Sequence, residues 1–358
     1  MHYRLDSKKS SLVDRVINGI KCGIYPAGSR MPSERQIAEY YDGSRTVVRQ
    51  AIRELLSRQI IMRSGRRVVV HADALQVIEN GSAQARLKVT MILTPNQLNF
   101  PIIQKIVSTV LNNISNDVCL SVLCTSKYLA ENLTRVNRQD LIVVVGPAFD
   151  DFALEVIAQK CKAMLLLNMP HDRFNFITPD HYAGGRLMAK HLWENHHAAI
   201  GSIYLTSIND NEFGQRFNGA RDFLGEHNLA IETVPVNRTA NVDKAATYQQ
   251  GFEYLYKHNP KITAILSLWD TIALDLYELI AAKGMKIPDD ISMVGFDDQF
   301  YCSMVTPPLT TVRYPAEAIG LETAQSICGF LETGHLAIQS LITPTLLQRG
   351  SVKNLAPK

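Results

Sequence analysis

The feature that most constrains the fold is an alternation of apolar, β-prone runs with helical segments that begins at residue 88. Strands that read as nearly continuous apolar runs are buried on both faces, and strands separated by helices pair in parallel. The sequence therefore predicts parallel α/β sheets covered by helices, and about 270 residues suffice for two lobes of this kind. The predicted strands are Val89–Leu93, Val118–Leu123, Leu141–Val145, Ala163–Leu167, Ile200–Leu205, Thr263–Ser267 and Ile291–Gly295.

The segment before this alternation differs from it in charge. Residues 1–75 carry 14 Lys and Arg against 7 Asp and Glu, whereas the remainder carries 23 against 27, within a net charge of +3. A basic head on a mildly acidic body indicates that the head meets a polyanion. A solvated surface explains the same charges, and charge alone does not separate the two interpretations.

The head has the pattern of three helices and a hairpin. Apolar residues recur at helical spacing from Leu12 to Ile20, Ser33 and Gln36 form a capping-box pair, and Ser44 can cap a third helix that runs to about Ser57. Two β-prone runs, 60–63 and 66–70, flank Ser64-Gly65 as a two-residue turn. This order predicts a winged helix-turn-helix.

Basic side chains fall where such a domain meets duplex DNA. A helix fits the major groove, and its first residues reach the base edges. Free N–H groups at the helix starts can bind phosphate, and a basic wing can clamp the minor groove. The candidates are Arg45 and Arg49 on the third helix, Arg35 on the second, Ser33 and Ser44 at the helix starts, and Arg66 and Arg67 on the wing. For Arg53 we favour a surface salt bridge.

Two stretches of the head resemble the DNA-binding domain of GntR-type bacterial regulators. They are Gly28-Ser-Arg-Met-Pro-Ser-Glu-Arg35 and Ser44-Arg-Thr-Val-Val-Arg49-Gln-Ala-Ile. The resemblance implies operator contacts by Arg35, Arg45, Thr46 and Arg49, with Gly65 in the minor groove. Arg66-Arg67 departs from the small residues usual in this wing.

In the body, polar and aromatic side chains follow two predicted strands. Trp269-Asp270 ends one strand, and Phe296-Asp297-Asp298 ends the next. Ligands of open α/β sheets bind at the carboxyl ends of strands, and a sugar needs carboxylates for its hydroxyls, an arginine donor and aromatic faces. Arg216 can supply the donor. Asp270 could instead cap a helix, and Trp269 could be a core residue.

Several motifs of the body together resemble the effector domain of lactose-repressor-type regulators, which is related to periplasmic sugar-binding proteins. They are Thr178-Pro-Asp180-His-Tyr-Ala-Gly-Gly185, Arg216-Phe-Asn-Gly219, Trp269-Asp270-Thr-Ile-Ala, Gly284 to Asp298, Thr306-Pro-Pro-Leu-Thr-Thr311 and Pro344-Thr-Leu-Leu-Gln-Arg349. The resemblance implies two lobes joined by three crossovers, near residues 178–182, 305–311 and 341–345. It also implies ligand contacts by Arg216, Asp270, Asp297 and an N-terminal aromatic loop at Asn99-Phe100. Trp269 stands where asparagine is frequent.

The predicted fold class is thus α/β, an N-terminal winged helix-turn-helix followed by a two-lobed periplasmic-binding-protein-like domain with parallel sheets. The expected boundaries are 1–72 for the DNA-binding domain, 73–87 for a linker and 88–358 for the effector domain. Lobe one is expected over about 88–178 and 308–342, and lobe two over about 182–305 and 343–351.

The expected function is a cytoplasmic transcription regulator, a repressor that binds double-stranded operator DNA as a homodimer. A small-molecule effector, a mono- or oligosaccharide, is expected between the lobes. An activator or a non-sugar effector in the same architecture is the alternative. We also weighed a sugar-modifying enzyme that uses Asp270 and Asp297, and a periplasmic transport receptor. Neither is favoured, because the sequence shows no nucleophile elbow, phosphate loop, metal cluster or secretory signal. No cofactor, metal, catalytic residue or membrane partner is expected, and the six cysteines are scattered.

Overall fold

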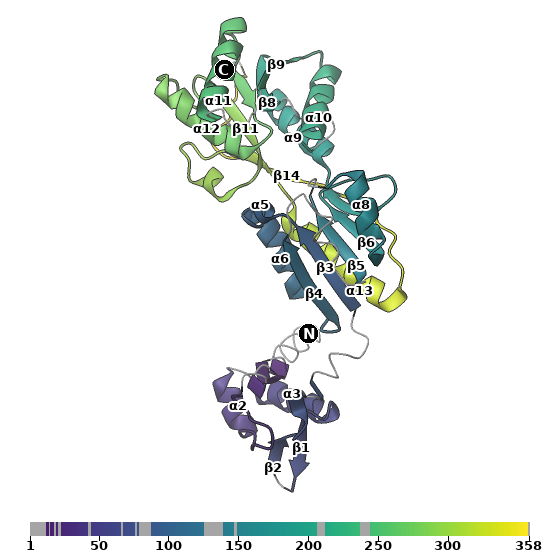
Figure 1. Ribbon diagram of the computed structural model, residues 1–358. Helices are drawn as coiled ribbons and strands as arrows, with labels where there is room; N and C mark the ends of the chain where they lie inside the picture. The colour runs from purple at the N-terminus through teal and green to yellow at the C-terminus, as the bar shows by residue number, and fades with distance from the viewer. Residues whose placement is uncertain are drawn as a thin grey trace. The chain divides into compact units, whose positions relative to one another are not determined.

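The computed structural model describes residues 12–13, 15–17, 19–20, 23–41, 44–65, 67–75, 77–78, 87–124, 139–146, 149–205, 212–236 and 244–356. These residues form two compact units. One comprises residues 1–87 with 115–119, and the other comprises residues 88–114 with 120–358. Figure 1 shows their elements, and each unit is described by itself.

The first unit is built on helices with well-defined starts. The described residues of 12–20 are helical and precede α2 (Glu34–Tyr40) and α3 (Arg45–Ser57). The Ser33 hydroxyl accepts from the Gln36 amide while the Ser33 amide donates to the Gln36 side chain, which completes the predicted capping box. The hydroxyl of Ser44 accepts from the amide of Val47 and so starts α3 at the predicted residue.

A hairpin completes this unit. Strands β1 (Ile61–Ser64) and β2 (Arg67–Val70) pair antiparallel, with Ser64 opposite Arg67. Ser64 therefore belongs to β1 and the turn begins at Gly65, one residue later than the predicted Ser64-Gly65. Gly65 has φ of 62°, a left-handed conformation that glycine adopts without strain. One apolar core joins the hairpin to the helices through Val16, Ile37, Val48, Leu55 and Val70.

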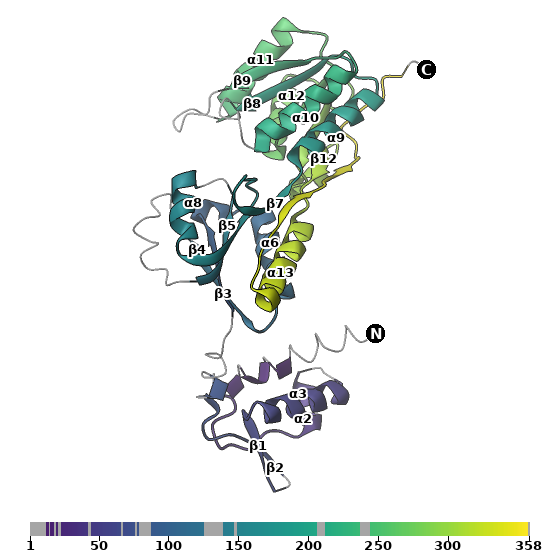
Figure 2. The same cartoon turned by 90° about the vertical axis from the view of Figure 1, so that its right-hand side faces the viewer.

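The second unit contains two sheets, each of six strands. The first has the order β13-β7-β6-β5-β3-β4 and is parallel wherever a pairing register is given. Figure 2 shows it between α8 on one side and α6 with α13 on the other. Its elements are β3 (Leu87–Leu93), α5 (Pro95–Leu98), α6 (Pro101–Asn113), β4 (Val118–Cys124), β5 (Gln139–Val145), α8 (Asp151–Ala158), β6 (Cys161–Leu167), β7 (Asn175–Pro179), α13 (Ala316–Thr333) and β13 (Gln339–Ile342).

The second sheet has the order β14-β12-β11-β10-β8-β9, with only β14 antiparallel to its neighbour among the pairings of this sheet. Because crossovers between parallel strands are right-handed, α9 and α10 cover one face while α11 and α12 cover the other. Its elements are α9 (His181–Glu194), β8 (Ile200–Leu205), α10 (Glu212–Glu226), β9 (Ile231–Val236), α11 (Lys244–His258), β10 (Ala264–Leu266), α12 (Asp270–Ala282), β11 (Ser292–Asp297), the 3₁₀ helix η1 (Phe300–Ser303), β12 (Thr310–Arg313) and β14 (Thr345–Leu347).

These elements confirm the predicted fold class, and every predicted strand run of the α/β unit overlaps a strand of the structure. Within the described part of the chain, no helix combines the length and apolar character needed to cross a membrane.

The chain passes between the sheets after β7, after β12 and after β13. The expected crossover at 305–311, and the expected start of the second lobe-one segment at 308, are wrong. Strand β12 pairs in parallel with Val294–Asp297 of β11 and so belongs to the second sheet. The chain leaves that sheet only after Arg313, on its way to α13.

Helices α9 and α10 cross with their backbones in contact. A methyl group on Gly185 would lie 1.8 Å from the carbonyl oxygen of Arg216, and one on Gly219 would lie 2.0 Å from that of Tyr182. Side chains at either position would force the helices apart, so the two glycines set the distance between them.

We expect Gly219→Ala to lower the thermal unfolding midpoint of the α/β unit by several degrees, because overpacking against a backbone costs about 1–3 kcal/mol. Gly225 lies on the same helix with nothing within 4 Å of an added methyl group. Gly225→Ala should leave the midpoint unchanged or raise it slightly. Equal midpoints for the two variants in a thermal melt would show that the close crossing is not required.

Candidate functional site

The second unit holds a pocket of about 270 Å³ where the carboxyl ends of its two sheets approach each other. In each sheet the chain starts at an inner strand, β3 or β8, and later strands add on both sides of it. Ligand sites of open α/β sheets lie beside such a strand, where the direction of the winding reverses. The segments that follow both strands, α5–α6 and α10, contribute to the pocket.

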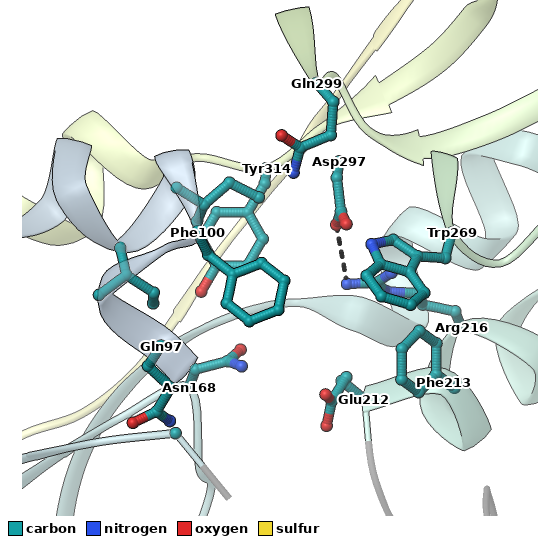
Figure 3. Close-up of a pocket in the computed structure, with 13 residues that line it drawn as sticks. Gln97, Phe100, Asn168, Glu212, Phe213, Arg216, Trp269, Asp297, Gln299 and Tyr314 are labelled. Atoms are coloured by element: carbon teal, nitrogen blue, oxygen red, sulfur yellow. Dashed lines mark hydrogen bonds and ion pairs between the residues drawn. The ribbon is translucent and has the colours of Figure 1, made fainter. Parts of the chain in front are cut away.

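The pocket wall combines aromatic and polar side chains from both lobes (Figure 3). Its rings are those of Phe100, Phe213, Trp269 and Tyr314, and its polar side chains are those of Gln97, Asn168, Glu212, Arg216, Asp297 and Gln299. Ile102, Ile103 and Gly146 complete the lining. A few polar groups among apolar walls are typical of a small-molecule site.

Arg216 is the most heavily bonded side chain of the pocket, and it is 3% exposed. Its Nη2 donates to Asp297 Oδ1 at 3.1 Å, and its Nη1 donates to the carbonyl oxygen of Leu268 at 2.7 Å. Its guanidinium carbon lies 3.7 Å from the centre of the Phe296 ring and 5.2 Å from that of Phe213. The guanidinium is thus fixed by hydrogen bonds in its plane and by rings against its faces.

His181 connects this arginine to the first lobe. Arg216 Nε donates to His181 Nδ1 at 3.2 Å, so the ring proton resides on Nε2, which donates to Asn168 Oδ1 at 3.0 Å. Burial, with the charge of Arg216, holds the pKa of His181 well below its usual value. The imidazole is therefore neutral, and it joins α9 to the end of β6.

Asp297 sits on strained backbone at the pocket. Its φ is 120°, and the φ of Asp298 is 56°, both in the left-handed region that favours glycine. Asp298 is held by two hydrogen-bonded ion pairs, one with Arg313 at 2.8 Å and one with Arg349 at 2.6 Å. Burial raises the pKa of Asp297 to about 7, although Arg216 opposes the shift.

Asp270, predicted as a ligand contact, does not line the pocket. It is fully buried, and its carboxylate accepts from the amide of Gln299, the hydroxyl of Thr311 and the thiol of Cys302. It is the first residue of α12, whose N-cap is Trp269, so it does not act as the predicted side-chain cap. The carboxylate instead fixes the loop after β11, and burial raises its pKa to about 6.

Of the other predicted ligand residues, four line the pocket and one does not. Phe100, Arg216, Trp269 and Asp297 line the pocket together, whereas Asn99 is exposed outside the lining as the C-cap of α5. The ligand contacts of these residues stay a prediction.

Sequence reasoning missed several lining residues. Gly146 and Asn168 directly follow β5 and β6, so applying the strand-end rule to those predicted strands would have found them. Tyr314 follows β12, which was not predicted, and Glu212 opens α10 without a recognisable motif. Gln97 has a structural role, because its side chain bonds Thr94 and the carbonyl of Val145.

In the first unit, every described residue predicted to meet DNA is exposed. These are Ser33, Arg35, Ser44, Arg45, Thr46, Arg49, Gly65 and Arg67, and Arg66 lies outside the described residues. The opposite side of α3 is buried at Val47, Val48, Ala51 and Leu55. Helix α3 therefore presents a basic first turn and a half to solvent while its apolar side holds it in the core.

Two of these arginines pair with carboxylates of α2. Arg35 donates to Glu39 at 2.9 Å and Arg49 to Glu34 at 3.2 Å, with all four side chains substantially exposed. Exposed pairs of this kind contribute little to stability, about 0–1 kcal/mol, so phosphate can replace the carboxylate at small cost. Over the described residues, no group of three or more His, Cys, Asp or Glu side chains is arranged to hold a metal ion.

Two family descriptions match the chain. Residues 8–70 match bacterial regulatory proteins of the gntR family, and residues 189–352 match the periplasmic binding protein-like domain. The chain joins a GntR-type helix-turn-helix domain to a periplasmic-binding-protein-like domain. Both resemblances seen in the sequence are thereby confirmed.

Curated relatives of the chain are transcription regulators. It is 29% identical over 226 residues to the HTH-type transcriptional regulator GalR of Escherichia coli, which covers 62% of this chain and 64% of GalR. It is 23% identical over 354 residues to the arabinose metabolism transcriptional repressor of Halalkalibacterium halodurans. This aligned region covers 93% of this chain and 90% of that repressor. The chain thus spans just under two thirds of GalR but nearly all of the arabinose repressor.

Solved structures share the fold of the α/β unit. A LacI family regulator from Enterococcus faecium with bound ribose aligns with a TM-score of 0.62 at 18% identity, covering 75% of this chain and 99% of that one. The lac repressor dimer bound to operator and the anti-inducer ONPF aligns with a TM-score of 0.61 at 21% identity, covering 78% and 98%.

We expect Arg216→Ala to be destabilised more at pH 8 than at pH 5, measured as the thermal unfolding midpoint. Without the guanidinium, the folded pKa of Asp297 rises further above its unfolded value, so the loss of stability with rising pH extends to higher pH. Below the pKa of Asp297 in the unfolded chain, the carboxyl is protonated in both the folded and the unfolded state. There the loss of stability of Arg216→Ala relative to the wild type is smallest. Removing one partner of a buried pair costs about 3–5 kcal/mol.

The control is the double variant Arg216→Ala with Asp297→Asn, in which no buried carboxylate remains at that position. Its pH dependence should match that of the wild type or be weaker. A deficit in Arg216→Ala that stays constant from pH 5 to pH 8 would contradict the charge pairing of the two residues.

Proposed function

We propose that the protein is a sequence-specific DNA-binding transcription regulator, a repressor controlled by a sugar that binds between the lobes of its α/β domain. One observation carries the proposal: the chain unites a winged helix-turn-helix with a two-lobed unit whose pocket is lined from both lobes. A binding site between lobes can favour one arrangement of them, which is the condition for coupling a ligand to a second site.

The DNA-binding part rests on the exposed face of α2 and α3. Arg45, Thr46 and Arg49 occupy the first turns of α3, where a recognition helix reaches base edges. The starts of both helices and the wing with Gly65 and Arg67 are exposed, so they are available for phosphate contacts. The named relatives GalR and the arabinose repressor are regulators of transcription, which supports this assignment.

The effector part rests on the pocket. Its four rings can cover the C–H faces of a sugar. Its carboxylates can accept hydrogen bonds from sugar hydroxyls, and its side-chain amides can both donate hydrogen bonds to hydroxyls and accept them. The related fold from Enterococcus faecium was solved with ribose, and the Halalkalibacterium relative is named for arabinose metabolism. Both names support a saccharide as the class of effector.

We infer a DNA-binding domain over 1–72, a linker over 73–87 and an effector domain over 88–358, although Ala74 and Ile78 of the linker range pack into the core of the first unit. We also infer a homodimer that places two DNA-binding heads on one operator in the cytoplasm. The lac repressor, which shares the fold of the α/β unit, was solved as a dimer bound to operator, and this supports the proposed assembly. The protein acts by binding and not by catalysis, since Asp270 is enclosed and Asp297 is paired with Arg216.

We expect Arg45→Ala and Arg49→Ala each to weaken binding to DNA from upstream of the gene by about 5- to 100-fold in a mobility-shift titration. Each change removes a contact to a base or a phosphate that contributes about 1–3 kcal/mol. The matched control is Arg53→Ala, an exposed arginine further along the same helix, which should change the affinity by less than about twofold. An equal loss in all three variants, or no retarded band for the wild type at low salt, would refute the proposed recognition face.

We expect Phe100→Ala to weaken the effector response by about 10-fold or more while DNA binding stays at the wild-type level. Phe100 lines the pocket yet is 41% exposed, so its removal takes a ring from the ligand at small cost to the fold. The readout is release of labelled DNA as sugars are titrated. Phe152→Ala, an exposed ring outside the pocket lining on α8, serves as the control. An unchanged response in Phe100→Ala would place the effector elsewhere.

A further inference from the structure

The pocket has two carboxyl groups beside one guanidinium, and this arrangement restricts the effector. Its charged lining residues are Glu212, Arg216 and Asp297. Arg216 and Asp297 form one ion pair at 3.1 Å, and both are buried. Glu212 is the carboxylate outside this pair.

The guanidinium of Arg216 is already largely engaged within the protein. Of its five N–H donors, three are used within the protein, by His181, Leu268 and Asp297. The two that remain can donate to a hydroxyl. A phosphate or carboxylate placed there would lie beside the carboxyl group of Asp297 and in the same pocket as the carboxylate of Glu212. Repulsion between like charges in a poorly solvated site is costly.

Glu212 is the first residue of α10 and is half-buried at the pocket. Figure 3 shows its carboxylate beside the ring of Phe213, on the side that faces Asn168. Within the described residues, this carboxylate has no hydrogen-bond or ion-pair partner, whereas Asp297 is paired with Arg216. The helix dipole favours a negative charge in the first turn of α10, so the fold tolerates this charge at the pocket.

The surroundings of Glu212 suit a cation. The ring of Phe213 lies next to it in sequence, and Trp269 lies 6.0 Å from Phe213 between ring centres. Aromatic faces attract organic cations. Tyr314, 7% exposed, lines the same pocket with a hydroxyl that has no hydrogen-bond partner among the described residues. Burial, with the charges of Asp297 and Glu212, raises the pKa of this hydroxyl, so it stays a neutral phenol.

We propose that the effector is an amino sugar, a hydroxylated ring whose protonated amine pairs with Glu212, and that sugar phosphates and sugar acids are rejected. The inference rests on the proposed function, because it names the ligand class of the same pocket. Glu212 supplies the charge, the rings of Phe213 and Trp269 cover the apolar face, and the two remaining donors of Arg216 serve hydroxyls.

The test compares matched sugars on the full-length protein by isothermal titration calorimetry. The probes are D-glucosamine, D-galactosamine and D-mannosamine, each beside its parent hexose and the 6-phosphate of that hexose. An amine replaces a hydroxyl of similar size in each pair, so a difference in affinity reports the charge. We expect at least one amino sugar to bind at least 10-fold more tightly than its parent, and no phosphate to bind.

The variant Glu212→Gln keeps the size of the side chain and removes its charge. We expect it to bind the amino sugar about 10- to 100-fold more weakly than the wild type, with the preference over the parent hexose lost. The control is Glu232→Gln on β9, an exposed glutamate outside the pocket lining, which should leave the affinity unchanged. Thermal unfolding without ligand should be alike for both variants and the wild type.

The inference is overturned if a parent hexose or a phosphate binds as tightly as the amino sugar, if no amino sugar binds, or if Glu212→Gln retains wild-type affinity. A separate mobility-shift arm keeps the two proposals distinguishable. A neutral sugar that binds and releases DNA would leave the proposed regulator intact while removing the amino-sugar inference. A wild-type protein that fails to retard its upstream DNA would instead remove the regulator.

Discussion

The architecture of the pocket depends on one buried guanidinium. Arg216 joins α10, on which it lies, to the start of α9 through His181, to the end of β10 through Leu268 and to the end of β11 through Asp297. Burying a guanidinium is unfavourable unless its N–H donors and its charge are satisfied. Loss of any one partner would leave a buried donor or charge unpaired, and this energetic cost keeps the partners in place. The tautomer of His181, with its proton on Nε2, follows from this arrangement because Nδ1 accepts from Arg216.

Much of the fold could be predicted because local patterns and tertiary structure agree. The apolar runs of the central strands, the serine caps of α2 and α3 and the glycine of the wing each have one favourable local solution. The strands that escaped prediction are short or of mixed character, such as Ile231–Val236 with its proline and Thr310–Arg313 with two threonines and an arginine. The sheet to which such a strand belongs is decided by long-range pairing, and the misplaced second crossover is the consequence.

The site was predictable to the extent that it follows strand ends. That rule placed Trp269 and Asp297 correctly at the pocket, yet it placed Asp270 there as well. Asp270 is separated from the pocket by its bonds to Gln299, Cys302 and Thr311, residues 29 to 41 positions away in the chain. No local pattern reports whether a strand-end carboxylate turns toward the ligand or toward a loop. For the same reason, Glu212 and Tyr314 carried no signal until the lobes were seen together.

The three passages between the lobes are very short. One residue separates β7 from α9, two separate β12 from α13, and two separate β13 from β14. The strands next to these passages are hydrogen-bonded neighbours, with β13 beside β7 and β12 beside β14. Three short connections that lie side by side restrict twisting and sliding of the lobes, so opening and closing about them is the motion that the connections favour. A molecule in the pocket would thus affect the rest of the chain through the angle between the lobes. Chemically different molecules that set the same angle would have the same effect.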